Sequence, residues 1–469
     1  MAVWSVNADF LEREAMNTTV QKVVTVFILG VCCWTTPCFA EEPGREKLVL
    51  GLPACIQRAL ASAPELGESR ADIELAASRL AEAKSYRFPR IELMNLIGPV
   101  PQARGNQVSS PDNINQTDRL TWFDRADATI VQPLYTFGKI AESMKAASHG
   151  IEVDRAKQEQ RQNEIALKVK EYYYGLLLAR ELKEVVLEVQ ESLAKAREKA
   201  QKLLDQESPN VEELDIYKLD AFAGEVGKYL EEARKGEALA LSALRTQIVV
   251  PADVELEIET GRLTVDAEHI PDLPLYLESA RTNRPEYKQI KQGLKARAAL
   301  VEAAQAAYYP DIFLAGYLSA AYAEKRDRIS NPFVPDQFNH FWAGAGLGIK
   351  WSLDFGITGA KVAAERAQYN RLLATSEFAE NNIPLQIKKS YLELREAEKS
   401  IEANRAAYTN AKKWAVAALA NFDFGVGPAK EIFDALQNYA RMRAAYFQSI
   451  YNYRLSQANL VYAVGETPL

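Results

Sequence analysis

The sequence predicts a mainly helical chain built from two copies of one unit, each with a pair of β-strands of the kind that cross a membrane. Three observations predict this fold: an internal repeat, a long heptad-like spacing of apolar residues, and short segments in which apolar residues alternate with small or polar ones. An export signal at the N-terminus supplies the context in which the strands are interpreted.

Residues 1–40 have the layout of a secretory signal peptide. An apolar run from Val23 to Trp34 is too short to span a bilayer as a helix, and small or turn-forming residues precede Ala40. The segment before Met16 is mixed and acidic, unlike a basic leader, so we expect Met16 to be the true start. Cleavage after Ala40 would change the formal net charge from −7 to −6 and leave Cys55 as the single cysteine. An intrachain disulfide is therefore not expected, and the lack of a basic patch argues against a nucleic-acid partner.

Two segments of the chain align at a constant offset of 221 residues. The sequence therefore predicts a first repeat at 41–250, an inter-repeat linker in the equatorial region at 251–273, and a second repeat at 274–469. Further along, "QPLYTFGKI" matches "WSLDFGITG" after one deletion. Matching residues are Pro64 and Pro285, Glu65 and Glu286, Pro89 and Pro310, and Gly138 and Gly356.

Each repeat is predicted to begin with an alanine-rich helix, at about 52–87 and 275–308, that ends at a proline. Two strands with a polar loop between them follow. Alternation is clearest at 340–353, where "GAGLG" lies inside the strand and not at a strand-to-helix turn, so we reject a nucleotide-binding loop. After the signal peptide no run of 18 apolar residues occurs, which excludes a transmembrane helix but not a transmembrane strand. The other strands are predicted at 90–97, 120–134 and 311–323.

Aromatic residues cluster around the predicted strands. In a soluble sandwich they would be ordinary core, whereas in a membrane protein they would form belts at the two membrane surfaces. The export signal favours the second interpretation. These residues are Trp122, Phe123, Tyr135, Tyr308, Tyr309, Tyr317, Tyr322, Phe341, Trp342 and Trp351.

A long helix is predicted to follow Gly138. Between Ile165 and Leu203 the apolar residues recur every three or four positions, which is typical of helices packed along a coiled coil. A return helix is predicted at 211–248, and the second copy repeats both helices at 357–424 and 429–464. A soluble helical bundle with misread strands is the rival interpretation, and the repeat, the export signal and the paired strand positions argue against it.

The order helix, strand, loop, strand, long helix and return helix, present twice, resembles the TolC-like outer-membrane factor family, the outer membrane efflux proteins. So do "QPLYTFG", "WSLDFG" and the final stretch "FDFGVGPAKEIFDALQNYARMRAAYFQSIYNYRLSQANLVYAVG". The resemblance implies a homotrimer in the cell outer membrane. Four strands per subunit would build one 12-stranded transmembrane β-barrel, and the long helices would continue it as a coiled-coil tunnel through the periplasm.

The resemblance also implies an exit duct for a tripartite efflux pump, driven by an RND, ABC or MFS transporter, or for a type I secretion system. Implied partners are a periplasmic adaptor (membrane fusion) protein, an inner-membrane transporter and outer-membrane lipid. Drugs, metal ions, solvents and polypeptides all remain open as cargo. The alternative function is a periplasmic structural or interaction coiled coil without a channel. No nucleophile motif, phosphate loop, metal spacing or cofactor motif is present, so we expect no enzyme and no cofactor.

The change from strand to helix is assigned to particular residues. Pro133 lacks the N–H that would continue a strand ladder, and Gly138 permits backbone angles that a side chain would oppose. Ser352 stands where Pro133 does in the first repeat, so Gly356 is expected to carry the second junction alone. Pro89 and Pro310 are expected at the other two junctions, where the first helix of each repeat gives way to a strand.

The hairpin tip of the second repeat is the part that the resemblance implies to face an adaptor. The first repeat has Pro209 where the glycine would fall, so we do not assign the same contact there. Gly425 and Gly427 could equally serve only to end a helix. The expected tip residues are Phe422, Asp423, Phe424, Gly425, Val426 and Gly427.

Glu431 and Asp434 lie three residues apart and therefore on one face of the helix that leaves this tip. The resemblance implies that both point into the narrow periplasmic end of the tunnel, where threefold symmetry would make rings of carboxylates. Ordinary solvated residues of an amphipathic helix are the alternative, and the first repeat offers only Asp215 at the matching place. Pro384 is expected to kink the second long helix.

Overall fold

A computed structural model describes residues 47–105, 114–208, 211–259, 261–265, 269–329, 331–424, 426 and 428–466. The predicted signal peptide with Met16, and the predicted tip residues Pro209, Gly425 and Gly427, lie outside these ranges. The chain divides into two compact units. The smaller comprises Met1–Leu48 and Pro251–Glu255, and in its second segment the N–H of Val254 donates to the carbonyl of Pro251 over 3.3 Å. The larger comprises Val49–Val250 and Leu256–Leu469.

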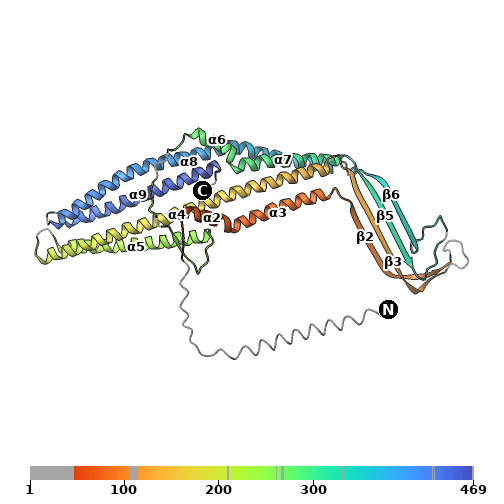
Figure 1. The fold of residues 1–469 in the computed structure, drawn as a ribbon, viewed down its shortest axis with the longest axis horizontal. Coiled ribbons are helices and arrows are strands. Elements are labelled where there is room, and N and C mark those ends of the chain that lie inside the picture. The colour runs from red at the N-terminus through yellow and green to blue at the C-terminus, as the bar shows by residue number, and fades with distance from the viewer. Residues whose placement is uncertain are drawn as a thin grey trace, which may run out of the picture. The chain divides into compact units, whose positions relative to one another are not determined.

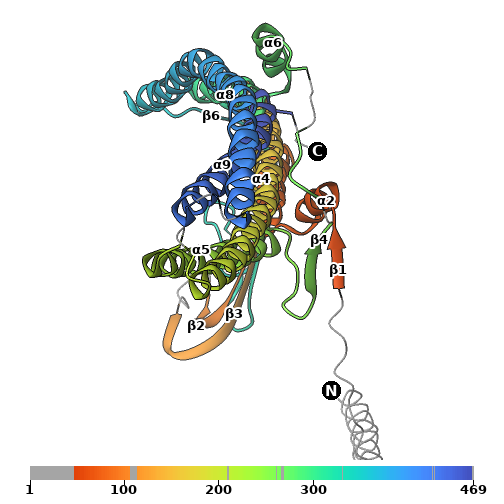
Figure 2. The same cartoon turned by 90° about the vertical axis from the view of Figure 1, so that its left-hand side faces the viewer.

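Over the described ranges the chain is mainly helical, with a four-stranded sheet (Figure 1) and a small two-stranded sheet of β1 and β4 (Figure 2). In chain order the elements are β1 (Lys47–Leu50), α2 (Leu52–Ser62), α3 (Pro64–Ser85), β2 (Arg90–Arg104), β3 (Ile114–Tyr135), α4 (Lys139–Asp205), α5 (Glu213–Gln247), β4 (Glu255–Ile258), α6 (Leu273–Asn283), α7 (Pro285–Gln305), η1 (Ala306–Tyr308), β5 (Asp311–Ala323), β6 (His340–Lys350), α8 (Ile357–Asp423) and α9 (Ala429–Val464).

The four-stranded sheet is antiparallel throughout and has the order β2-β3-β5-β6. The helices that continue these strands, α3, α4, α7 and α8, pack side by side in the same order. Each strand is therefore joined to the helix that holds the same position in the row of helices as the strand holds in the sheet. Among the described strands β2 pairs only with β3 and β6 only with β5, and one isolated bridge joins Ala103 of β2 to Arg326, so both edges of the sheet are open over most of their length.

Two helix hairpins, α4–α5 and α8–α9, form a large part of the larger unit. Helices α4 and α8 each have 67 residues, which corresponds to about 100 Å at about 1.5 Å per residue. The return helices α5 and α9 have 35 and 36 residues. Helix α4 packs against α5 and also against α9, so it joins the two hairpins (Figure 2).

The predicted coiled-coil positions of α4 do form a core. Val189, Leu193, Ala196 and Ala200 are buried together with residues of α5, α8 and α9, among them Phe222, Phe422, Ile432 and Tyr439. Helix α8 runs through Pro384 without interruption. Among the described residues, no helix combines the length and the apolar character needed to cross a membrane.

The first helix of each repeat differs from the prediction, because both are broken in two. Helix α2 ends before Pro64 and α6 ends before Pro285, and each proline begins the next helix. The residues before them, Ala63 and Arg284, have extended backbone angles, as expected for a residue that precedes proline. Strand β5 occupies the predicted range, whereas β2 and β3 extend to Arg104 and from Ile114 into the segment predicted as a loop.

Candidate functional site

Each long helix begins directly after a Phe-Gly pair with positive φ. Phe137 and Phe355 have φ of 49° and 48°, and the glycines that follow, Gly138 and Gly356, have φ of 95° and 143°. A Cβ at Gly356 would meet no atom within 4 Å, so the backbone angle and not a lack of space requires glycine there. The chain therefore changes direction between strand and helix at two consecutive residues, a phenylalanine and the glycine that follows it.

The prolines take different places around these turns. Pro133 lies inside β3, and the register with β5 shifts just after it, which marks a bulge. Strand β6 ends at Lys350, before Ser352, so the second junction needs no proline. Pro89 and Pro310 lie immediately before the first residues of β2 and β5.

Polar contacts fix the two helix starts differently. The Lys139 ammonium at the start of α4 lies 2.8 and 2.7 Å from the two carboxylate oxygens of Asp311 on β5. At the start of α8, Asp354 accepts the backbone N–H of Thr358 over 3.1 Å and its hydroxyl over 2.6 Å. These bonds, first that from the hydroxyl, lower the pKa of Asp354. At the first junction the Thr136 hydroxyl accepts the N–H of Ile140 over a longer distance, 3.5 Å.

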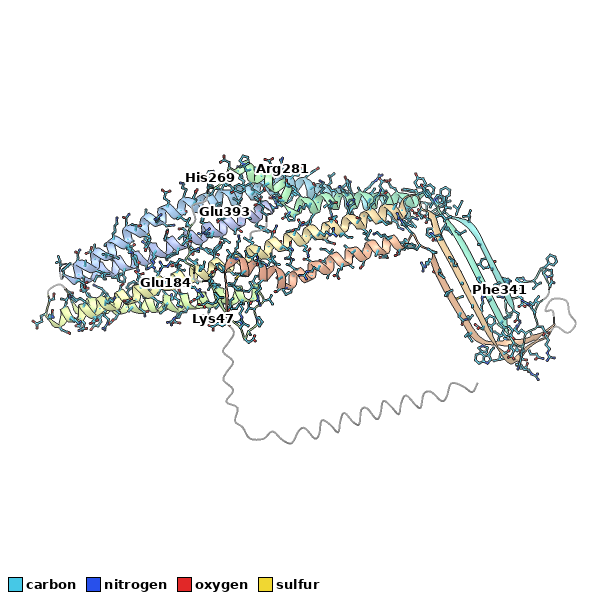
Figure 3. The ribbon with its side chains drawn as sticks, viewed as in Figure 1. Lys47, Glu184, His269, Arg281, Phe341 and Glu393 are labelled. Atoms are coloured by element: carbon cyan, nitrogen blue, oxygen red, sulfur yellow. The ribbon has the colours of Figure 1, made fainter. Side chains whose placement is uncertain are left out.

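The two faces of the four-stranded sheet have different chemistry. Residues paired across strands share a face, and Ile91 pairs with Ile130 while Leu314 pairs with Leu347. This face, the apolar face, is largely solvent-exposed in the single chain, and Phe341 on β6 belongs to it (Figure 3). On this face Asn95 of β2 donates to Asp124 of β3 over 2.8 Å. The opposite face, the charged face, carries Arg90, Glu92, Arg125, Asp127, Asp311 and Lys350.

The glycines of "GAGLG" make room on the charged face. A Cβ at Gly344 would lie 2.7 Å from the ring of Tyr317, and a Cβ at Gly348 would lie 2.5 Å from the ring of Phe313. Both rings come from the neighbouring strand β5, in register with these glycines. The glycines therefore serve cross-strand packing of aromatic rings, which agrees with a strand and not with a phosphate-binding loop.

The tip of the second hairpin exposes two apolar side chains. Phe424 and Val426 are 82% and 78% exposed, and the N–H of Val426 donates to the carbonyl of Asn421 over 2.9 Å. Phe422, which we also assigned to the adaptor-facing tip, is 1% exposed and lies in the hairpin core. The helical period explains this, because Phe422 continues the buried positions Ala415 and Ala418 of α8. Phe422 is thus a packing residue.

The two acidic positions of α9 lie differently. Glu431 is exposed, whereas Asp434 is half-buried and lines a groove of about 430 Å³ between α5 and α9. Asp215 of α5 lines the same groove, so the carboxylates that the sequence analysis aligned by repeat also lie near one another. The Asp215 carboxylate accepts the N–H of Glu212 over 3.3 Å and is part of a capping box.

A contact between the hairpins was missed by the sequence analysis. Tyr439 of α9 donates to Glu188 of α4 over 2.8 Å, and Arg443 donates to the Glu188 carboxylate and, over 2.9 Å, to the Tyr439 oxygen. Burial would raise the pKa of Glu188, but these hydrogen bonds outweigh it and lower the pKa. Burial, and then the bond to Glu188, raise the pKa of Tyr439. The partners are 251 residues apart, so no local pattern predicts the contact.

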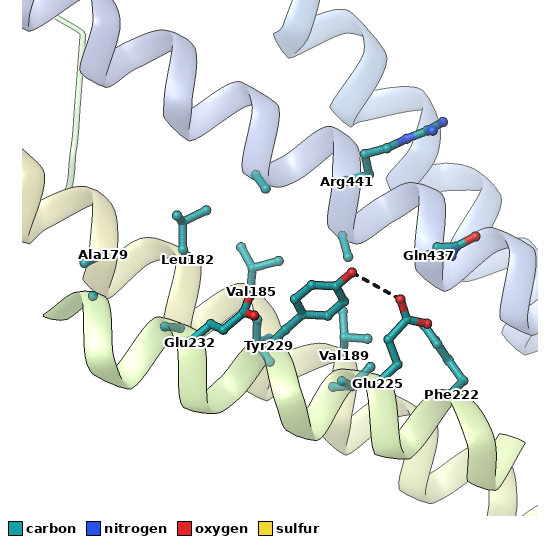
Figure 4. A pocket seen from close by; sticks show the side chains of 16 residues that line it. Ala179, Leu182, Val185, Val189, Phe222, Glu225, Tyr229, Glu232, Gln437 and Arg441 are labelled. Atoms are coloured by element: carbon teal, nitrogen blue, oxygen red, sulfur yellow. Dashed lines mark hydrogen bonds between the residues drawn. The ribbon is translucent and has the colours of Figure 1, made fainter.

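An apolar groove of about 600 Å³ lies beside this contact, between α4, α5 and α9 (Figure 4). Leu182, Val186 and Val189 of α4 line it, and Tyr229 of α5 lies across it with its hydroxyl donated to Glu225 over 3.1 Å. The groove therefore follows the outer edge of the seam between the hairpins.

No metal-binding group of histidine, cysteine and acidic residues occurs within the described ranges. Cys55 is free and fully buried, and burial raises the pKa of its thiol to about 11. A thiol in this state is not a nucleophile at neutral pH.

Comparison with known proteins finds a family model that matches part of the chain and solved structures that share its fold. Residues 276–466 match the model of the outer membrane efflux protein family. The outer-membrane channel OprN has 17% identity and a TM-score of 0.73 over 88% of this chain and 89% of its own. CusC, described with transmembrane channel formation, has 15% identity and a TM-score of 0.73 over 90% and 94%. The outer membrane protein VceC from Vibrio cholerae has 16% identity and a TM-score of 0.71 over 88% and 96%. The search of curated proteins finds no match.

Proposed function

We propose that the chain is a subunit of an outer-membrane duct that discharges the cargo of an efflux pump or secretion system, and the match of residues 276–466 to the outer membrane efflux protein family supports this. The observation that carries the proposal is the four-stranded sheet, which combines a largely exposed apolar face with two open edges. In water both features are unfavourable, because apolar surface and unpaired strand edges promote aggregation.

In a membrane, the unpaired backbone groups at the edges of β2 and β6 would need hydrogen-bond partners from other strands. Bilayer hydrocarbon offers no hydrogen bonds to unpaired backbone groups, so subunits must pool their strands into one closed barrel. Three chains with four strands each would form the 12-stranded barrel that the resemblance implies. The apolar face would then contact lipid and the charged face would line the duct.

The aromatic residues support this orientation. Tyr135, Tyr309 and Trp351 lie at the junction end of the sheet and are more than half exposed. Trp122, Tyr322 and Phe341 lie at the opposite end and are also more than half exposed. Two aromatic groups separated by the length of the strands fit the belts of a membrane barrel.

The hairpins would extend the duct into the periplasm, where the exposed Phe424 and Val426 would dock an adaptor that connects to an inner-membrane transporter. An apolar pair at a tip is a suitable anchor, because interface energy concentrates in a few buried side chains. Gly425 and Gly427 keep their proposed role in shaping this tip. Phe422, which is buried within the hairpin, would support the tip from inside.

Glu431 and Asp434 are proposed to line the narrow end of the duct, with Asp215 nearby. Three copies of each carboxylate would attract cations and repel anions. Wild-type channels in planar bilayers should therefore be cation-selective and blocked by multivalent cations from the periplasmic side. The double variant Glu431→Ala, Asp434→Ala should weaken both properties, and unchanged selectivity and block would remove these residues from the constriction.

Fractionation tests the function as a whole. We expect the protein to co-sediment with outer membranes, to migrate as a heat-modifiable trimer on gels, and to conduct ions in planar bilayers. Deletion of the gene should sensitise the cells to at least one compound in a panel of toxic agents. Recovery of the protein as a soluble periplasmic species that forms no trimer in detergent would contradict the proposal and favour the periplasmic coiled-coil alternative.

A further inference from the structure

A cavity of about 720 Å³ lies where the four-stranded sheet meets the helices. Five elements contribute to it: α3, β3, α4, β5 and β6. Much of its wall is apolar, with Ile140 of α4, Val131 of β3 and Phe313 of β5 among the lining residues. The ring of Phe313 can lie in this wall because its partner Gly348 has no side chain.

Some charged side chains of the cavity have a hydrogen-bond or salt-bridge partner, and others do not. Lys139 is neutralised by Asp311, at 2.7 Å, and Glu82 accepts the hydroxyl of Tyr86 over 3.1 Å. Within the described part of the chain, Arg79 of α3 and Lys350 of β6 form neither a salt bridge nor a side-chain hydrogen bond. The described lining thus holds three cations and two carboxylates, a net charge of +1, with Arg79 and Lys350 as the unpaired cations and Glu82 as a carboxylate that no cation neutralises.

The cavity opens on the charged face of the sheet. Phe313 is in register with Pro133 on one side and with Gly348 on the other, and Asp311 is in register with Lys350. Residues in register share a face, and in the proposed barrel this face lines the duct and is turned away from lipid. A membrane lipid is therefore the less suitable occupant, and a molecule in transit is the better one.

From this geometry we propose that the cavity is a binding site for small anionic amphiphiles, molecules with an apolar body and one carboxylate or sulfonate, on their way through the duct. The apolar body would contact Ile140, Val131 and Phe313, and the anionic group would pair with Arg79 and Lys350. Charge complementarity supports this class, because burying an apolar cation beside two unpaired cations is unfavourable. The inference rests on the proposed function for the direction in which the charged face points.

Binding to the purified protein tests the inference without a pump. Decanoate and decyltrimethylammonium have similar apolar chains and opposite charges, and equilibrium dialysis against the protein in nanodiscs measures the affinity of each. We expect saturable binding of decanoate and none of decyltrimethylammonium. The double variant Arg79→Gln, Lys350→Gln should lower the decanoate affinity at least about tenfold. Lys291→Gln, which removes an exposed lysine of α7 outside the cavity, is the matched control and should bind as the wild type does.

A second variant tests whether binding needs the volume of the cavity as well as its charge. Ser143→Phe places a ring at a half-buried position of the cavity wall and should abolish decanoate binding while Arg79 and Lys350 stay in place. Heat-modifiable trimer formation by every variant shows that it is folded. Equal binding by wild type and double variant, equal binding to empty nanodiscs, or no saturable binding because a neighbouring subunit fills the cavity would each overturn the inference. If the wild type forms no trimer and no channel, the proposed function fails first.

Discussion

The hairpins α4–α5 and α8–α9 are built from helices of nearly equal length but end in tips of opposite character. At the first tip, Glu207 and Gln206 are exposed polar residues, and the return helix starts with a capping box at Glu212. At the second tip, Phe424 and Val426 are exposed apolar residues. Because the helices of the two hairpins have nearly equal lengths, the tips occupy matching positions in the two repeats. The difference between the tips is therefore chemical. We therefore assign partner recognition to the second tip.

Charging the second tip should have the largest effect on resistance. Phe424→Asp with Val426→Asp removes the apolar anchors and places charge where an apolar contact is expected. Resistance to an exported compound should fall at least about tenfold, which corresponds to about 1.4 kcal/mol in a binding equilibrium. The readout is the minimal inhibitory concentration in cells that contain equal amounts of trimer.

The first tip supplies the control for that experiment. Gln206→Asp adds a charge at the matching end of the other hairpin and should leave resistance unchanged. Equal loss of resistance from both sets of variants would mean that the tips are equivalent, and the assignment of recognition to one of them would be wrong.

The strand-to-helix junctions form the second comparison. Gly138 has φ of 95° and Gly356 has φ of 143°, and neither would bring a Cβ closer than 3.8 Å to another atom. The cost of alanine is therefore a backbone cost. We expect about 1 kcal/mol for Gly138→Ala, as for left-handed helical angles. For Gly356→Ala we expect about 3 kcal/mol, because its angles are almost restricted to glycine.

Denaturant unfolding in detergent, followed by circular dichroism, measures the two changes. The order of the two effects is the critical result. A Gly138→Ala variant that is less stable than Gly356→Ala would show that the crowding or strain lies elsewhere in the junctions.

The sequence predicts the regular elements well because their signals are local. Alternation and Pro310 define β5, and the three-to-four spacing defines the buried side of α4. The breaks before Pro64 and Pro285 were also visible locally, but the alanine-rich periodicity on both sides concealed them. The burial of Phe422 was not evident from the sequence because exposed and buried residues follow one another within one helical turn.

Contacts between distant segments explain what the sequence does not predict. Glu188 and Tyr439 are 251 residues apart, and the junction cavity draws its residues from five elements. The role of Gly348 likewise depends on Phe313 of the neighbouring strand. A single sequence carries no record of such pairings, because their distance along the chain is unrelated to their distance in space.

The two tyrosine–glutamate bonds near the hairpin seam give a smaller test. Tyr439 is 5% exposed and its bond joins α9 to α4, whereas Tyr229 is 45% exposed and bonds Glu225 within α5. Tyr439→Phe should cost about 1 kcal/mol, since it keeps the ring but removes a hydrogen bond at a buried site. Tyr229→Phe should have no measurable effect, because water can replace an exposed partner. Denaturant unfolding of both variants is the measurement.

The pH dependence of the Tyr439 variant has a defined sign. The pKa of Glu188 is lowered in the folded state, so its contribution is present above the unfolded pKa and is lost as the pH falls through the folded value. The difference between wild type and Tyr439→Phe should therefore shrink on acidification below about pH 4. A difference that grows in acid would contradict the assigned hydrogen bond.

The smallest effect is expected at the first turns of the two long helices. Asp354 accepts two bonds from Thr358, and Thr136 accepts one long bond from Ile140, so Asp354→Ala should loosen α8 more than Thr136→Ala loosens α4. Hydrogen exchange at the amides of Thr358 and Ile140 measures this directly. The pKa of Asp354 is lowered in the folded protein, so its protection is present above the unfolded aspartate pKa and is lost as the pH falls through the folded value. Faster exchange at Thr358 in Asp354→Ala should therefore be evident at neutral pH. Equal exchange in wild type and variant at neutral pH would remove Asp354 from the junction.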